Sequence, residues 1–238
     1  MFRVSGSLLF RCLILTLLLC GWCGISHAWE NLDPESEAAL KLTPNPENGR
    51  WVYQGCAVCH MPEGWGTPNG AYPQIAGQHR SVIIKQLADI RANNRDNPSM
   101  YPFTLPEELG GIQSIADVAQ HIENLKMTLA TSKGPGDDLL RGKRLYDEYC
   151  VECHGERGEG DAEMVYPRIQ GQHYPYLLRQ MDWIRNGKRR NANRKMEEAI
   201  RMFSDQDLKS VADYVSRMPP DESRRSAGDW SNRDYGRR

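Results

Sequence analysis

Apolar residues recur at helical spacing in four stretches of this chain, and the four stretches form two pairs. The earlier stretch of each pair has its apolar residues at Val82, Ile83, Leu87 and Ile90, and at Leu177, Leu178, Met181 and Ile184. The later stretch has them at Ile115, Val118, Ala119 and Ile122, and at Leu208, Val211, Ala212 and Val215. Positions three and four apart share one face of an α-helix, so these stretches predict amphipathic helices. Since no alternating strand pattern of useful length appears, the predicted fold class is all-α.

The ends of two helices can be placed from local signals. In the second half, the segment from Leu139 to Tyr149 predicts a helix that runs into Cys150. Ser204 followed by Asp207 matches a capping pattern that starts a helix. Glycine- and proline-rich sequence follows the cysteines in both halves and disfavours regular structure. Each half is therefore predicted to run helix, loop, helix, loop, helix.

A repeat organises the chain into two similar units. Shifting the sequence by 94 residues places Cys56–Arg91 over Cys150–Arg185 without a gap, and 14 of the 36 positions are identical. The identical positions include both cysteines, the histidine that follows them, two glycines, and a glutamine in the middle helix (Gln86 and Gln180). The block Tyr-Pro-x-Ile-x-Gly-Gln-His occurs at 72–79 and again at 166–173. The repeat predicts two domains of one architecture.

The two ends of the chain differ from this repeat. Residues 1–28 have the pattern of a cleavable export signal: an early positive charge, an apolar run from Leu13 to Leu19, and small residues before a cleavage point after Ala28. Residues 29–133 and 134–220 are the two predicted domains, joined near a glycine- and proline-containing linker at 131–136. Residues 221–238 are rich in Arg, Asp, Ser and Gly, which predicts a poorly ordered tail.

Composition narrows the possible functions. The formal net charge of the whole sequence is −1, which does not favour a nucleic-acid-binding protein. Of the seven cysteines, three lie in the predicted signal. The other four form two Cys-x-x-Cys-His motifs, Cys56/Cys59/His60 and Cys150/Cys153/His154, so that the exported chain has no other thiol.

The two cysteine motifs predict two haem c groups. Two thiols three positions apart can bond the two vinyl groups on one porphyrin edge, and the next residue, histidine, then lies under the iron as proximal ligand. Two alternatives compete with this interpretation. Four cysteines could instead bind one zinc ion, or each pair could form a redox disulfide, although such disulfides occur in βαβ contexts that this sequence lacks.

The sixth ligand of each iron is predicted from the repeat register. After a two-residue insertion, Met100 aligns with Met196, and both follow the middle helix of their unit. A thioether is a soft, neutral ligand that raises the reduction potential relative to a second nitrogen ligand. Met202 is a rival in the second unit, and the repeated His79 and His173 are alternatives that would give bis-histidine ligation.

The most basic stretch of the chain lies just before Met196. It contains Arg185, Lys188, Arg189, Arg190, Arg194 and Lys195. Three interpretations fit: neutralisation of haem propionates, a docking patch for a partner, or a solvated loop.

With these residues in view, the chain resembles the two-haem class I cytochromes c of the cytochrome c4 type. The resemblance covers both cysteine motifs, both Tyr-Pro-x-Ile-x-Gly-Gln-His blocks and both late methionines. It implies two tandem cytochrome c-like helical domains, each around a covalently bound haem, with His/Met ligation of both irons. It also implies that the carbonyls of Pro73 and Pro167 orient the proximal histidines. A long segment with Pro102 and Pro106 between Met100 and the closing helix departs from the family pattern.

These observations predict a periplasmic electron carrier. Each iron would have both axial positions filled and would bind no small-molecule substrate, so no catalytic residue is assigned. The expected partners are redox proteins that donate or accept electrons, for example a membrane-bound oxidase or dehydrogenase. One alternative is an enzyme, a two-haem peroxidase with one open iron. Another is a fixed electron-transfer subunit of a dehydrogenase or oxidase complex.

Overall fold

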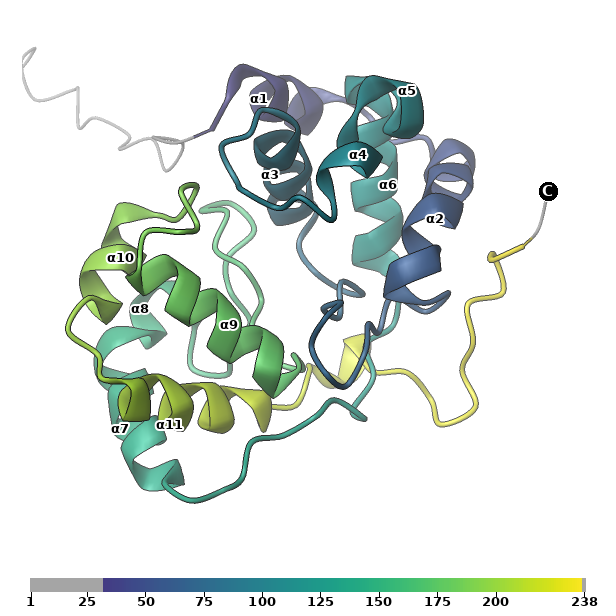
Figure 1. Cartoon of the computed structure of the whole chain (residues 1–238). Coiled ribbons are helices and arrows are strands. Elements are labelled where there is room, and N and C mark those ends of the chain that lie inside the picture. The colour runs from purple at the N-terminus through teal and green to yellow at the C-terminus, as the bar shows by residue number, and fades with distance from the viewer. Residues whose placement is uncertain (1–31, 237–238) are drawn as a thin grey trace, which may run out of the picture. The chain divides into compact units, whose positions relative to one another are not determined.

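The helices of the computed structural model fall into two groups that follow the sequence repeat (Figure 1). The structure describes residues 32–236, and the predicted signal at 1–28 lies outside them. The first half contains α1 (Pro34–Lys41), α2 (Pro46–His60), α3 (Arg80–Arg91), α4 (Tyr101–Thr104), α5 (Pro106–Leu109) and α6 (Ile112–Asn124). The second half contains α7 (Leu139–Tyr149), α8 (Val151–His154), α9 (Tyr174–Arg185), α10 (Arg194–Ile200) and α11 (Asp205–Ser216).

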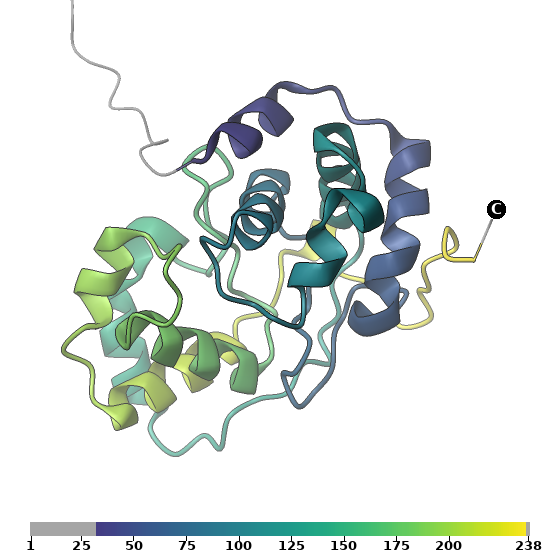
Figure 2. The same cartoon turned by 45° about the horizontal axis from the view of Figure 1, so that its top comes forward.

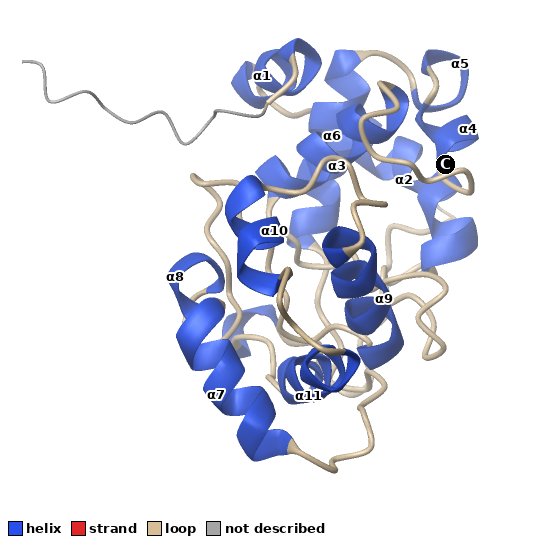
Figure 3. Cartoon of the chain, turned by 60° about the vertical axis from the view of Figure 1, so that its left-hand side comes forward, coloured by secondary structure: helices blue, strands red, loops and turns tan. Residues whose placement is uncertain are grey.

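The predicted all-α class is confirmed. Over the described range, Figure 3 shows helices and loops only, and extended pairing is limited to two isolated bridges. A single turn of 3₁₀-helix, η1 (Glu222–Arg224), follows α11. Within residues 32–236, no helix is both long and apolar enough to cross a membrane.

Local sequence signals account for where several helices begin. Asn45 caps α2, because its side chain accepts hydrogen bonds from two backbone N–H groups of the first turn, and Pro46 follows at the first helical position. Ser204 and Asp207 form the predicted capping box at the start of α11. The segment that contains Pro102 and Pro106 forms α4 and α5, each with a proline in its first turn, where a missing N–H costs nothing.

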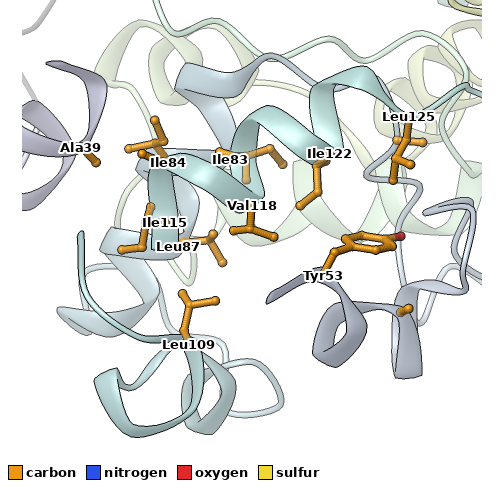
Figure 4. Packing of buried hydrophobic residues seen from close by; sticks show 14 residues of the cluster. Ala39, Tyr53, Ile83, Ile84, Leu87, Leu109, Ile115, Val118, Ile122 and Leu125 are labelled. Carbon is orange, nitrogen blue, oxygen red and sulfur yellow. The ribbon is translucent and has the colours of Figure 1, made fainter. Parts of the chain in front are cut away.

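Each half has its own hydrophobic core. In the first half, apolar residues of α1, α2, α3 and α6 meet around Tyr53, Ile84, Ile115 and Val118 (Figure 4). In the second half, α7, α9 and α11 meet around Tyr146, Leu208 and Val211. The predicted apolar faces of the middle and closing helices are the faces buried in these cores.

A glycine on the helix that leads into each cysteine motif allows close contact with the closing helix of the same half. A Cβ at Gly49 in α2 would collide with the backbone carbonyl of Asp117 in α6, and one at Gly142 in α7 would collide with that of Ser210 in α11. The α2–α6 and α7–α11 pairs therefore cross with their backbones nearly touching. The last turn of α2 and the α7–α8 junction, where the cysteines lie, are held in place by these crossings.

The end of the chain returns to the first half. Beyond α11, residues 221–236 cross to the first half, and the last part of this segment lies beside α2, as both views show (Figures 1 and 2). Met127 forms an isolated β-bridge with Arg225, and the rings of Trp65 and Trp230 lie 5.8 Å apart. The composition predicted a poorly ordered tail; in the structure, Trp230 and two backbone hydrogen bonds of Met127 join residues 221–236 to the first half. The average composition of a segment does not reveal a contact made by one residue, such as that of Trp230 with Trp65.

Candidate haem-binding sites

The two cysteine motifs occupy equivalent places at the ends of helices. Cys56, Cys59 and His60 lie in the last turn of α2, and Cys150 lies at the junction of α7 and α8, with Cys153 and His154 in α8. Both histidines are buried, at 6% and 7% exposure. Each half thus places two thiols and one imidazole together on a helix end that faces its own core.

The surroundings of the four thiols bear on the choice between haem attachment, a redox disulfide and a zinc site. All four cysteines are free, and burial raises the pKa of Cys56 and of Cys150 to about 12. A redox-active Cys-x-x-Cys requires a lowered thiol pKa, so this environment disfavours the disulfide alternative. Among the described residues, no three His, Cys, Asp or Glu side chains converge as ligands of one metal ion, which disfavours the zinc alternative.

Both histidines have the protonation pattern that a metal ligand requires. His60 Nδ1 lies 3.0 Å from the Pro73 carbonyl oxygen, and His154 Nδ1 lies 3.0 Å from that of Pro167. A carbonyl only accepts, so Nδ1 carries the proton, and Nε2 of the neutral ring keeps its lone pair. Burial lowers the pKa of both rings despite these hydrogen bonds, and this favours the neutral form. Sequence resemblance implied these two carbonyl partners, and the structure contains both contacts.

Two repeated glycines make these contacts sterically possible. Gly66 and Gly160 have φ of 70° and 68°, a region that suits glycine. A Cβ at Gly66 would collide with the Pro73 carbonyl group, and one at Gly160 would collide with that of Pro167. The glycine-rich loop can therefore fold back until the proline carbonyl reaches the imidazole.

The methionines differ sharply in their surroundings. Met100 packs, partly buried, against the core of the first half, as Cys56 does, and Met196 packs against the second core, which contains Cys150. Met202 is 88% exposed and projects away from the second core. Of the candidate sixth ligands, Met100 and Met196 are the two that share a core with the attachment cysteines of their own half.

His79 and His173 are engaged in contacts between the halves. His79 Nε2 lies 2.8 Å from the carbonyl oxygen of Glu159, and His173 Nε2 lies 2.9 Å from that of Trp65. The two acceptors are themselves equivalent in the repeat, so the contacts are related by approximate twofold symmetry. Because each Nε2 donates to a carbonyl, neither nitrogen is free to bind iron, which disfavours bis-histidine ligation.

The glutamines of the repeated blocks complete this interface. Gln172 accepts from the backbone N–H of Gln74 (3.0 Å) and donates to its carbonyl (2.8 Å). Gln78 accepts from the N–H of Arg168 (2.9 Å) and donates to its carbonyl (2.8 Å). The sequence showed that the blocks repeat, and it offered the histidines only as alternative iron ligands. Strong identity within a loop between two copies was the available signal that the copies contact each other.

Comparison with known proteins agrees with this arrangement. The cytochrome c family model matches residues 139–219. Cytochrome c4 from Thiocapsa roseopersicina is 30% identical over 192 residues, which span 75% of this chain and 95% of that protein. The chain belongs to the cytochrome c4 family. Another relative of this cytochrome, from Stutzerimonas stutzeri strain A1501, is named thiosulfate dehydrogenase electron acceptor; it is 31% identical, over 71% of this chain and 81% of the relative.

A solved structure of the family has the same fold. The crystal structure of reduced recombinant cytochrome c4 from Pseudomonas stutzeri superposes with a TM-score of 0.64 at 25% identity, and the match covers 74% of this cytochrome and all of the other chain. This cytochrome therefore consists of two cytochrome c domains, carries two covalently bound haem c groups and transfers electrons. The donor set described above fits these groups, since each half offers two thiols and a neutral imidazole.

Proposed function

We propose that this cytochrome carries single electrons between redox proteins of the periplasm, with one haem in each half and no substrate chemistry at either iron. Cys56 and Cys59 would attach the first haem, and Cys150 and Cys153 the second. His60 with Met100, and His154 with Met196, would be the axial ligands. The observation that carries the proposal is the pair of buried, neutral histidines, each with Nδ1 bound to a proline carbonyl and Nε2 available.

The protein's own residues would hold the iron and set its environment. When bound, haem supplies a ferric/ferrous couple that accepts and releases one electron. The proline carbonyls fix the orientation of the two imidazoles and make them better ligands. The two cores bury the site, and because low dielectric penalises the more positive ferric state, burial raises the reduction potential.

The proposed domains are residues 29–133 and 134–220, with residues 1–28 as an export signal. The division is supported by the helix grouping, α1–α6 and α7–α11, and by the export pattern of the first residues. The partners would be a dehydrogenase as donor or an oxidase as acceptor. A dehydrogenase donor is supported by the S. stutzeri relative, which is named thiosulfate dehydrogenase electron acceptor.

Methionine ligation is tested by spectroscopy on protein that has been matured with covalent haem. The ferric protein should show the far-red band of an iron–thioether bond. Met100→Ala and Met196→Ala should each remove about half of that band, and the double variant should remove it all. Met202→Ala is the matched control, because the Met202 side chain is 88% exposed, and it should leave the band unchanged.

The same measurements discriminate between a carrier and an enzyme. A high-spin ferric signal in the unmodified protein, together with peroxide turnover, would establish the two-haem peroxidase instead. Haem quantitation must also give two covalent groups per chain, and a count of zero would overturn the attachment sites. Co-purification with a dehydrogenase or oxidase would distinguish a fixed subunit from a free shuttle.

A further inference from the structure

Two arginines meet where the halves contact each other, at positions that are equivalent in the repeat. Arg95 donates from Nη1 to Gln86 Oε1 (2.7 Å) and from Nη2 to Gln180 Oε1 (3.2 Å). Arg189 does the reverse, from Nη1 to Gln180 Oε1 (2.9 Å) and from Nη2 to Gln86 Oε1 (3.0 Å). Each guanidinium thus bonds both glutamines, one from its own half and one from the other. The identity of Gln86 and Gln180 in the repeat has its structural explanation here.

This arginine pair has an excess of positive charge. Within residues 32–236, neither guanidinium forms an ion pair, and the nearby carboxylate, Asp89, is already paired with Lys85. Arg95 is 8% exposed, and burial together with Arg95 lowers the pKa of Arg189 to about 9. Burial alone would raise the pKa of Tyr176, but the surrounding arginines outweigh it and lower that pKa. The local field therefore favours a negative charge at this position.

An uncompensated buried cation is costly. Leaving one without a partner destabilises a protein by several kcal/mol, and arginine does not relieve the cost by losing its proton. Arg95 also donates from Nη2 to Tyr176 Oη (3.4 Å), and Arg189 donates from Nε to Asn191 Oδ1 (3.3 Å). Each guanidinium has five N–H groups, so two on each have no partner among residues 32–236. A planar guanidinium with free donors is the group best suited to bind a carboxylate.

We propose that Arg95 and Arg189 form one shared cationic site that binds propionate carboxylates of both haems. The inference rests on the proposed attachment of haem to both cysteine motifs, and it names what this part of the interface does for those groups. Arg95 lies between α3 and Met100, and Arg189 lies between α9 and Met196, so each belongs to the loop that leads to the proposed sixth ligand of its own half. Basic residues near Met196 were one predicted source of propionate neutralisation; the structure selects Arg189 and adds Arg95.

If both haems share the site formed by Arg95 and Arg189, their reduction potentials should depend on the same two residues. A fixed positive charge disfavours the ferric state of any haem close to it, so removing the charge lowers the reduction potential. If both haems use one site, then removing either arginine affects both of them. A site that served only its own haem would give two independent effects.

The test is a spectroelectrochemical titration of holoprotein in which two covalent haems have first been counted. Arg95→Gln and Arg189→Gln should each lower the ferrous-to-ferric ratio of both haems about tenfold at a given applied potential, which is about 59 mV for a one-electron couple. Lys188→Gln is the matched control. It removes the same charge one residue away, from an exposed side chain that packs on Trp183, and solvent screening should keep its effect below about threefold.

The two steps of the titration are assigned with Met196→His, which lowers the potential of the second haem. Arg95→Lys and Arg189→Lys keep the positive charge, and they are the variants to measure if a Gln variant fails to fold. In both Lys variants, the reduction potential of each haem should fall, but by less than in the corresponding Gln variant. A fall in reduction potential at only one haem would overturn the shared site. So would an equal fall in Lys188→Gln, or a Lys variant whose potentials are as low as those of the corresponding Gln variant. Fewer than two haems in the unmodified protein would contradict the proposed attachment instead.

Discussion

The glutamine contacts between the halves should be a major source of stability, and Gln172→Ala tests them. Gln172 is 8% exposed, and its amide makes three hydrogen bonds. It accepts from the backbone N–H groups of Gln74 and His173, each at 3.0 Å, and donates to the Gln74 carbonyl at 2.8 Å. The substitution removes all three bonds and leaves three backbone groups in a buried interface without these partners.

The expected loss follows from the groups that remain. A buried backbone donor or acceptor without a partner costs about 1–3 kcal/mol. Water that enters the space left by the amide would recover part of this cost. We therefore expect Gln172→Ala to lower the free energy of unfolding by about 3 kcal/mol, at the low end of the sum for three groups. For a chain of this size, that change lowers Tm by about 6–12 °C.

The assay is equilibrium denaturation of the holoprotein, followed by circular dichroism and by haem absorbance. Gln120→Ala is the control, because the Gln120 amide bonds only nearby side chains of its own helix region, Glu123 and Asn124. It should cost no more than about 0.5 kcal/mol, as expected for a surface substitution. If Gln172→Ala cost no more than Gln120→Ala, then the contacts between the halves would not be stabilising and the reasoning would be refuted.

Two further substitutions and one pH dependence are predicted from the same structure. Trp230→Ala should lower the free energy of unfolding by about 2–3 kcal/mol, because it removes the ring that packs on Trp65, and heat denaturation measures this. Gly142→Ala should cost at least about 3 kcal/mol in denaturant titrations, since its Cβ would collide with the Ser210 carbonyl. Burial lowers the pKa of His173 below its unfolded value of 6.5, so the unfolded chain binds more protons, and stability should be full above pH 6.5 and decline as pH falls below it.

Each of these three predictions has its own control variant. Tyr235→Ala removes a more exposed ring of the same tail and should have little effect, so an equal loss in both would argue against a specific Trp230 contact. Gly55→Ala, in α2 with open space around the Cβ, should stabilise the protein by about 0.5–1 kcal/mol. His173→Asn replaces the imidazole with a side chain that does not titrate. The decline in the free energy of unfolding below pH 6.5 should therefore be smaller in this variant.

Much of the helical fold was predictable, because local forces decide it. The spacing of Leu208, Val211 and Val215 predicts the buried face of α11, and Ser204 with Asp207 predicts its start. These signals depend on residues within a few turns of one another. The tail after α11 was not predictable in the same way, because its contact with Trp65 joins residues far apart in the sequence.

The residues of the candidate sites also fall into those that local sequence predicts and those that only long-range contacts bring together. By itself, the sequence showed the repeat and predicted the attachment motifs and the proximal histidines, since covalent attachment of haem imposes a fixed local spacing. Only the tertiary structure shows that Met196 and Met202 have different surroundings: Met196 packs, partly buried, against the second core, and Met202 is exposed. The tertiary structure alone also placed Arg95 beside Arg189, because two loops meet there only after both halves have folded and docked. Long-range contacts of this kind leave no periodic trace in a single sequence, so the shared interface is a property of the fold.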